Sequence, residues 1–245
     1  MLIARCADAV MAVLFAPTCA ACHQPLHSPV HGAVCESCWT AIHPLTEPLC
    51  EICGDALTSW RVGVMAARRC VRCRRMPRVI TRARAIASYE GSLRHILHAL
   101  KYKDRRSLAR PLGTLMRDAG ATVLRGADFV VPVPLHFIRR YRRGFNQASE
   151  LARHVGMPVL DALRRTRATA TQTDLPEAQR HRNVRDAFTI RRAARSRLQG
   201  SVLVVIDDVS TTGATLDACA RVLLAAGARE VRALTAARAA SRLPQ

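Results

Sequence analysis

The chain has 245 residues, of which 49% are hydrophobic and 4% aromatic, and its formal net charge is +20 at pH 7. Its length and apolar fraction favour one medium-sized domain with a small additional module, and they exclude a chain that is disordered throughout. A charge of this sign and size attracts polyanions such as nucleic acids or phosphorylated ligands. Lys101 and Lys103 are the only lysines, so arginine, which binds phosphate in a bidentate manner, carries most of the charge.

The N-terminal segment, residues 1–16, is short and apolar, with Arg5 near its start and Asp8 within it. A signal peptide is the alternative interpretation, but the acid interrupts the apolar run and no small-residue cleavage pattern precedes the first cysteine pair. We therefore predict an N-terminal amphipathic helix over residues 1–16. No apolar run approaches the ~20 residues that a membrane-spanning helix needs, so we expect no membrane insertion and a cytoplasmic location.

Eight of the ten cysteines form four C-x-x-C pairs. The eight are Cys19, Cys22, Cys35, Cys38, Cys50, Cys53, Cys70 and Cys73. One such turn supplies two ligands of a tetrahedral zinc ion, and a second turn alongside completes the site. Sequential pairing gives two four-cysteine sites, although pairing of the second turn with the third, or interleaved pairing, stays open. Four thiolates leave no open position, so we predict two structural Zn²⁺ ions in a module over residues 17–76.

Other interpretations of the cysteines are weaker. A disulfide framework is typical of exported proteins, and the sequence has no convincing export signal. Thioredoxin-like redox pairs usually occur singly, at a strand-to-helix junction. His23 and His27 lie beside the first pair, but four cysteines already fill the coordination shell. Cys219 falls on the apolar face of a predicted helix, where we expect a buried thiol.

From residue 84 onward the apolar pattern alternates between strands and helices. We predict strands over residues 85–89, 129–133, 202–206 and 231–235, and helices that begin near Ser92, Ser107, Asn146 and Leu216. This alternation is typical of an α/β domain with a mainly parallel sheet, which we place over residues 84–245. A ligand site is expected at the carboxyl ends of its strands.

Residues 201–215 read SVLVVIDDVSTTGAT and combine a buried strand with a polar turn. Asp207 and Asp208 follow the apolar run directly. The turn then consists of Ser210, Thr211, Thr212, Gly213, Ala214 and Thr215. Adjacent carboxylates accept hydrogen bonds from a vicinal diol, and N–H groups at a helix N-terminus bind anions, so the segment predicts a ribose 5-phosphate site. The glycine spacing excludes both the GxGxxG fingerprint and the P-loop.

Two further segments are candidates for the same site. Arg139, Arg140, Arg142 and Arg143 follow the predicted strand at 129–133, where they could neutralise a pyrophosphate, track a nucleic-acid backbone or form a solvated face. The polar stretch 166–182 is predicted to form a lid over the site. Lys101 and Lys103 lie in the segment LKYKD, where they could contact a phosphate or be solvated, and for Lys101 we favour the phosphate contact.

Residues 201–215 resemble the motif with which type I phosphoribosyltransferases bind 5-phosphoribosyl-1-pyrophosphate (PRPP). The resemblance implies that Asp207 and Asp208 hold the ribose hydroxyls, that residues 211–215 wrap the 5-phosphate, and that Mg²⁺ bridges the pyrophosphate and the ribose hydroxyls. Purine-salvage members carry D-T-G here, with the Asp as acid and base toward the purine. Thr211 occupies that position in this sequence, so a purine acceptor handled in the same way is not expected.

The chain is also similar to the ComF family over nearly its whole length. The similarity rests on the four C-x-x-C pairs, LKYKD, VPVP, RRGFNQ at 142–147, TRATATQ and the DDVSTTGAT loop. It implies a role in the uptake or use of DNA, with single-stranded DNA and other DNA-uptake proteins as partners. Our leading hypothesis is a PRPP-dependent transferase of unknown acceptor, in which Arg142 and Arg143, or the lid, stabilise the departing pyrophosphate. The alternative is a non-catalytic adaptor that binds single-stranded DNA and uses PRPP only as a ligand.

Overall fold

The computed structural model describes residues 16–57, 68–102, 105–136, 141, 144–166 and 186–239. The helix predicted over residues 1–16 lies outside this part of the chain except for its last residue, and so does the predicted lid beyond Thr166. Arg142 and Arg143 also lie outside it. Among the helices in the described part, none combines the length and hydropathy of a transmembrane span.

Four parallel strands form the central sheet in the order β1-β6-β5-β2. Their bounds are β1 Ala83–Ser88, β2 Phe129–Pro132, β5 Val202–Ser210 and β6 Glu230–Arg238. A separate antiparallel pair consists of β3 Leu163–Arg165 and β4 Phe188–Ile190. The described helices are α2 Glu36–Thr40, α3 Val71–Arg75, α4 Gly91–Tyr102, α5 Ala109–Ala119, α6 Ala121–Leu124, α8 Gln147–Arg153, α10 Arg195–Leu198 and α11 Ala214–Ala225. This architecture confirms the predicted α/β class with a mainly parallel sheet.

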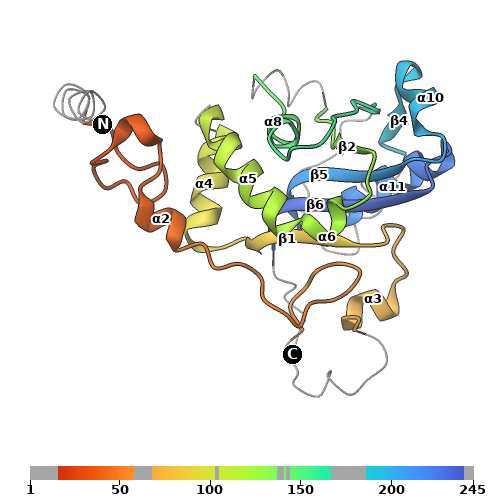
Figure 1. Cartoon of the computed structure of the whole chain (residues 1–245), viewed down its shortest axis with the longest axis horizontal. Helices are drawn as coiled ribbons and strands as arrows, with labels where there is room; N and C mark the ends of the chain where they lie inside the picture. Colours follow the sequence, from red (N-terminus) through yellow and green to blue (C-terminus); the bar gives the residue numbers. More distant parts are fainter. Residues whose placement is uncertain are drawn as a thin grey trace.

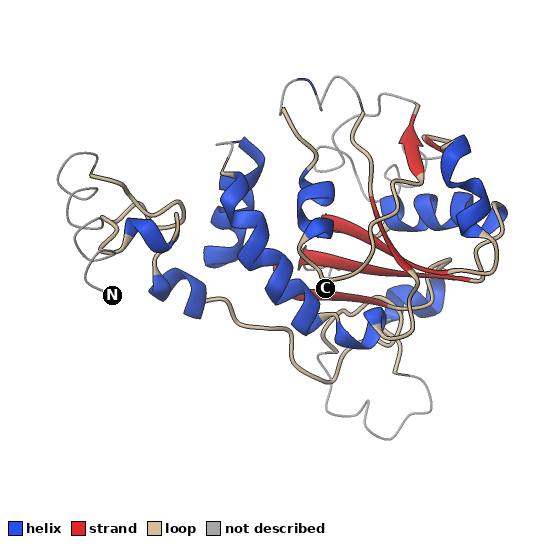
Figure 2. Ribbon diagram, turned by 45° about the horizontal axis from the view of Figure 1, so that its top comes forward, coloured by secondary structure: helices blue, strands red, loops and turns tan. Residues whose placement is uncertain are grey.

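Helices cover both faces of the sheet, as Figures 1 and 2 show. Val204 and Ile206 of β5 pack on one face with residues of α4, α5 and α8. Leu203 and Val205 point to the other face and pack with residues of α11. Because both faces are covered, the successive residues of β5 from Val202 to Ile206 are all apolar, which explains the unbroken hydrophobic run in the sequence.

β5 is longer than the apolar pattern predicts. We expected the strand to end at Ile206, but it continues through Asp207 and Asp208 to Ser210. Its neighbour β6 also has nine residues, and the pairing of the two strands extends to Ser210 opposite Arg238. The length of the paired neighbour therefore sets the end of β5, and both carboxylates extend from strand backbone rather than from a loop.

The cysteine-rich module contacts the sheet domain at two places. Leu26 and Ile42 of its first half belong to the same buried cluster as Leu97 of α4, and Figure 1 shows α2 beside α4. The second half reaches β1, where the Ala83 N–H donates a hydrogen bond to the carbonyl of Ile52 at 2.6 Å. The module is therefore attached to the α/β domain through both of its halves.

Candidate functional site

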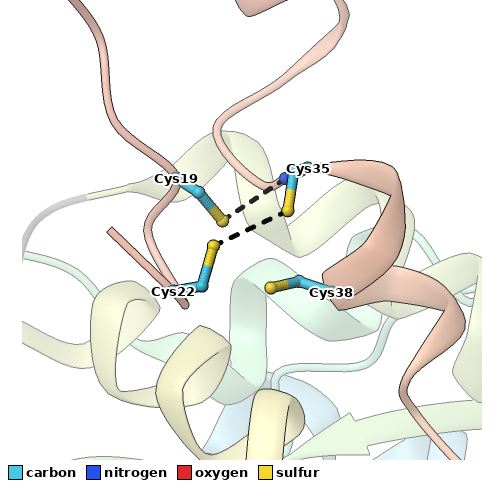
Figure 3. A group of neighbouring side chains, drawn as sticks. All are labelled: Cys19, Cys22, Cys35 and Cys38. Atoms are coloured by element: carbon cyan, nitrogen blue, oxygen red, sulfur yellow. Dashed lines mark hydrogen bonds between the residues drawn. The ribbon is translucent and has the colours of Figure 1, made fainter. Parts of the chain in front are cut away.

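The first cysteine cluster contains Cys19, Cys22, Cys35 and Cys38, whose sulfur atoms all lie within 4.8 Å of one another (Figure 3). The Cys35 N–H and the Ala21 N–H each donate a hydrogen bond to Cys19 Sγ at 3.4 Å. The Ser37 hydroxyl lies 3.1 Å from Cys35 Sγ and is the main cause of a pKa lowered to about 6 at Cys35. These contacts favour the thiolate form, which is the form that binds zinc.

The second cluster repeats this construction with Cys50, Cys53, Cys70 and Cys73, again within 4.8 Å. In both clusters the third cysteine is the N-cap of a short helix that carries the fourth, α2 in the first and α3 in the second. The cysteine pairs therefore associate in sequence order, and the alternative pairing of the second turn with the third is wrong. Four sulfur donors at this spacing fit a tetrahedral structural zinc ion.

The carboxylates of β5 lie at a cavity of about 410 Å³. Of the residues predicted for the ligand site, Lys101, Asp207, Asp208, Thr211 and Thr215 line it. They come from the end of α4, the end of β5, the turn that follows β5 and the start of α11, so the cavity opens at the carboxyl edge of the sheet as expected for this fold.

Three other predicted residues lie behind this surface. Ser210, Thr212 and Ala214 are buried, and they are not among the residues that line the cavity. Gly213 adopts the left-handed conformation, with φ at +79°, and is the N-cap of α11. These buried residues support the turn from the protein interior, while Thr211 and Thr215 line the cavity.

Lys101 makes an ion pair with a residue predicted to bind ribose. Its Nζ lies 2.8 Å from the Asp208 carboxylate, and the two side chains are 15% and 14% exposed. Burial lowers the pKa of Lys101, but Asp208, together with Tyr89 and Asp207, raises it, so the net shift is upward and the ammonium group stays charged. In the ligand-free cavity Lys101 is therefore paired with the Asp208 carboxylate and neutralises its charge.

Asp207 has a strongly perturbed carboxyl group. Burial, followed by the neighbouring Asp208 carboxylate, raises the pKa of Asp207 to about 7. Two carboxylates in such proximity ionise together only when a cation or a set of hydrogen-bond donors compensates them. The pair is thus complementary to a divalent cation or to the two hydroxyls of a ribose.

The turn between β5 and α11 offers backbone N–H groups. In the described part of the chain, the N–H groups of Thr211, Thr212 and Gly213 donate to no protein acceptor. The carbonyl oxygens, by contrast, are engaged: Thr212 O accepts from Arg78, and Gly213 O accepts from the Asp217 N–H at 2.9 Å. Three consecutive donors at the start of a long helix form an anion site of the size of one phosphate group.

A second cavity, of about 700 Å³, adjoins the first and shares Leu135, Asn146 and Arg165 with it. Its arginines are Arg106, Arg153, Arg164, Arg165 and Arg191. The Arg106 guanidinium stacks over the Phe145 ring at 4.7 Å, and this ring comes from the RRGFNQ motif. The adjoining cavity therefore presents a basic surface next to the carboxylate pair.

Several residues of the site escaped prediction from the sequence. Gln147, 2% exposed, lines the first cavity as the opening residue of α8. Asn146 caps that helix by accepting from the Ala148 N–H at 3.2 Å, and an Asn before a helical pattern is the only local signal. Tyr89 and Arg165 also line the cavity. No local sequence pattern predicts this, because segments distant in the sequence bring these residues to the cavity.

The chain matches two protein-family models. Residues 10–74 match the double zinc ribbon domain, and residues 133–244 match the phosphoribosyl transferase domain. The two match segments are consistent with the order of the modules along the chain, while our boundaries at residues 16, 76 and 84 stay predictions. With two four-cysteine clusters in place, the N-terminal part is a double zinc ribbon built for structural zinc.

Curated relatives align with most of the chain. DNA utilization protein YhgH of Escherichia coli K12 is 33% identical over 224 residues, which are 87% of this chain and 93% of that protein. Competence protein F of Haemophilus influenzae is 29% identical and covers 90% and 96%. Competence protein ComFC of Bacillus subtilis is 27% identical and covers 79% of each chain.

Among solved structures, the glutamine PRPP amidotransferase of B. subtilis is 26% identical to 52% of this chain, at a TM-score of 0.35. The match spans 26% of that enzyme, and a likeness of this size carries no argument about activity. The identity and coverage of the curated relatives are sufficient on their own. The chain belongs to the ComF family, with an N-terminal double zinc ribbon and a C-terminal phosphoribosyltransferase domain.

Proposed function

We propose that the chain binds PRPP at the carboxyl edge of its sheet. The observation that carries the proposal is the juxtaposition of the Asp207–Asp208 pair with the unengaged N–H groups of residues 211–213. A carboxylate pair suits the ribose diol, and the N–H groups suit the 5-phosphate that the same sugar carries. The phosphoribosyl transferase match over residues 133–244 supports the same ligand.

Within this proposal each group has a distinct role. Asp207 and Asp208 accept hydrogen bonds from the ribose hydroxyls, and Thr211, Gly213 and Thr215 surround the phosphate. Mg²⁺, when bound with the ligand, supplies charge neutralisation for the pyrophosphate. Lys101 balances the charge of Asp208 and contributes positive potential close to the ligand.

A transferase reaction with an acceptor of unknown identity is the activity we propose for this site. Catalysis would rest on positioning and on stabilisation of the leaving pyrophosphate. Arg142 and Arg143 stay our candidates for that stabilisation, and Arg165 is a further one because it lines both cavities. The names of the relatives refer to competence and DNA utilization, and we propose that this chain also acts in the use of DNA, in the cytoplasm.

Calorimetric titration of the zinc-loaded protein with PRPP and Mg²⁺ tests the ligand. We expect saturable binding by the wild type and loss of binding in the double variant Asp207→Asn, Asp208→Asn. The control is Asp118→Asn, because Asp118 is an exposed carboxylate of α5 that lines neither cavity. A folded wild-type protein that does not bind PRPP would show that the proposal is wrong.

A second candidate function is binding of single-stranded DNA without catalysis. It is favoured by the net charge of +20 and by the arginine-lined cavity that adjoins the carboxylate pair. Phosphate contacts release counterions, so binding should weaken steeply as salt rises. Fluorescence anisotropy with a labelled oligonucleotide tests this, with Arg106→Gln, Arg164→Gln as the double variant.

The matched control for DNA binding is the variant Arg221→Gln, Arg229→Gln, which also removes two exposed arginines but away from both cavities. We expect the Arg106→Gln, Arg164→Gln variant to lose affinity and to show a shallower salt dependence, while the control retains most of the affinity. Equal losses in both would point to non-specific charge rather than to the cavity.

A further inference from the structure

Arg78 connects the second zinc ribbon with the turn between β5 and α11. It follows α3 closely in the chain, and its side chain is 2% exposed. Its Nη1 lies 2.6 Å from the Asp217 carboxylate in the first turn of α11, and its Nη2 donates to the carbonyl of Thr212. One buried guanidinium thus joins the segment that leaves the second cluster to the turn and to the first turn of α11.

The contact is reinforced by backbone groups of the same segment. The N–H groups of Val79 and Ile80 donate to Asp217 Oδ1 at 3.2 and 3.4 Å. Gly213 lies so close that a Cβ at this position would approach Arg78 Nη1 to 2.6 Å. The turn is therefore packed directly onto the chain that leaves the second cluster.

Arg238 makes the equivalent connection at the other end of the turn. It is the last residue of β6 and is 5% exposed. Its Nε donates to the Asp55 carboxylate, and the backbone carbonyl of Asp55 accepts from the Cys50 N–H at 2.8 Å. Its Nη1 donates to Ser210 Oγ at 3.4 Å. A chain of contacts therefore runs from the backbone of Cys50, through Asp55 and Arg238, to Ser210.

The first zinc ribbon has no such connection in the part of the chain that the structure describes. Its apolar residues pack with α4, and the hydrogen bonds described above for its cysteines stay within the ribbon itself. The two clusters are alike in donor set but different in position. Loss of the first would disturb the surface of α4, whereas loss of the second would release Arg78 and Arg238.

We propose that the second zinc ribbon is the support of the turn over residues 210–215, with Arg78 and Arg238 as positioning residues. With the Cys50/Cys53/Cys70/Cys73 site formed, the two guanidinium groups hold Thr212 and Ser210 in the conformation that leaves the N–H groups of residues 211–213 unengaged. Occupancy of one structural metal site thereby controls anion binding at a separate site. The consequence for PRPP rests on the proposed function; the coupling between ribbon and turn does not.

Hydrogen exchange of the ligand-free, zinc-loaded chain tests the coupling directly. We expect Arg78→Gln and Arg238→Gln to retain the zinc content of the wild type and to speed exchange in peptides covering 209–216 by about tenfold or more. The matched control is Arg232→Gln, also in β6, whose partners Glu230 and the carbonyls of Val123 and Arg125 lie away from the turn. Exchange within twofold of the wild type in both test variants overturns the proposal, as does an equal increase in the control.

A second arm compares the two cysteine clusters. Cys53→Ser is expected to speed exchange in the same peptides, whereas Cys22→Ser is expected to leave it unchanged and to affect peptides of α4 instead. The reverse pattern overturns the proposal. If either serine variant fails to fold, the arginine variants still decide the outcome, since they leave all metal ligands in place.

The ligand arm separates this inference from the proposed function. PRPP affinity, measured by calorimetry, is expected to fall about tenfold or more in Arg78→Gln and Arg238→Gln and to be retained in Arg232→Gln. A wild type that does not bind PRPP overturns the proposed function alone, because the exchange measurement still decides the coupling. Faster exchange together with unchanged PRPP affinity overturns the link between the turn and the ligand.

Discussion

The ammonium group of Lys101 lies 2.8 Å from the carboxylate of Asp208, although one belongs to α4 and the other to β5. The pair forms because α4 covers the sheet and ends at its carboxyl edge, where β5 also ends. It places a positive charge beside two adjacent carboxylates. Removal of this charge should therefore change the whole site.

Lys101→Met is expected to weaken PRPP binding about tenfold at pH 7.5. Without the ammonium group, the Asp207–Asp208 pair repels the anionic ligand more strongly and the pKa of Asp207 rises further. Calorimetry measures the change, and Arg94→Gln on the exposed face of α4 is the control. Unchanged affinity in Lys101→Met would contradict a role for the ion pair in ligand binding.

The raised pKa of Asp207 has a consequence for stability. Its ordinary value is 3.8, and it is about 7 in the folded chain, so the folded state holds a proton between these pH values that the unfolded state has lost. The contribution of this group to stability is therefore largest below about pH 4 and falls as pH rises toward 7.

Asp207→Asn should remove this pH-dependent cost. We expect the variant to be more stable than the wild type at pH 8, on the order of 1–2 kcal/mol, and to lose the advantage near pH 4. Denaturant unfolding at the two pH values measures the difference, and Asp161→Asn, with a side chain 64% exposed, serves as the control. A stability difference that does not vary with pH would show that the pKa of Asp207 is the same in the folded and the unfolded chain.

Gly213 and Gly200 allow a matched comparison of two left-handed glycines. Both have positive φ, +79° and +69°, so alanine carries a similar backbone cost of about 1 kcal/mol at each. At Gly200 a Cβ meets nothing within 4 Å, whereas at Gly213 it meets Arg78. Gly213→Ala should therefore destabilise the chain by at least about 1 kcal/mol more and weaken PRPP binding, as measured by denaturant unfolding and calorimetry. Equal effects of the two variants would argue against the close packing of Arg78 on the turn.

The number of zinc ions bound per chain should depend on how many of the two cysteine clusters are intact. Elemental analysis is expected to give two zinc ions per chain, and one in each of Cys22→Ser and Cys70→Ser. Cys219→Ser should retain two, because Cys219 is fully buried in α11 and its pKa is raised by that burial. A strong chelator should unfold the ribbon, since the module depends on its metal for folding. Retention of both ions in a single-cluster variant would contradict the four-cysteine assignment.

Local features of this protein were predictable from its sequence. Two thiolates three residues apart suit one turn around zinc, and the apolar run before Asp207 indicates a strand covered on both faces. Such signals depend only on spacing along the chain, so they survive without knowledge of the fold. The antiparallel pair and the strand order, with β6 between β1 and β5, gave no comparable signal.

The length of β5 illustrates where local reasoning failed. Hydrophobicity ends at Ile206, but the strand continues because β6 offers backbone hydrogen bonds as far as Arg238. The partner strand is distant in the sequence, and its length cannot be read from residues 202–206. The prediction was therefore correct about the kind of element and wrong about its end.

The sequence by itself determined the chemistry of this protein: the cysteine turns, the carboxylate pair, the polar turn before α11 and the excess of arginine. Only the tertiary structure decided which of these groups meet. It pairs the cysteine turns in sequence order, brings Lys101 to Asp208, and places Arg78 and Arg238 between the second ribbon and the turn. The physical reason is that such contacts arise when segments far apart in the sequence cover the two apolar faces of one sheet. Many residues on those segments fit the same local hydrophobic pattern, so the pattern alone does not select which of them meet.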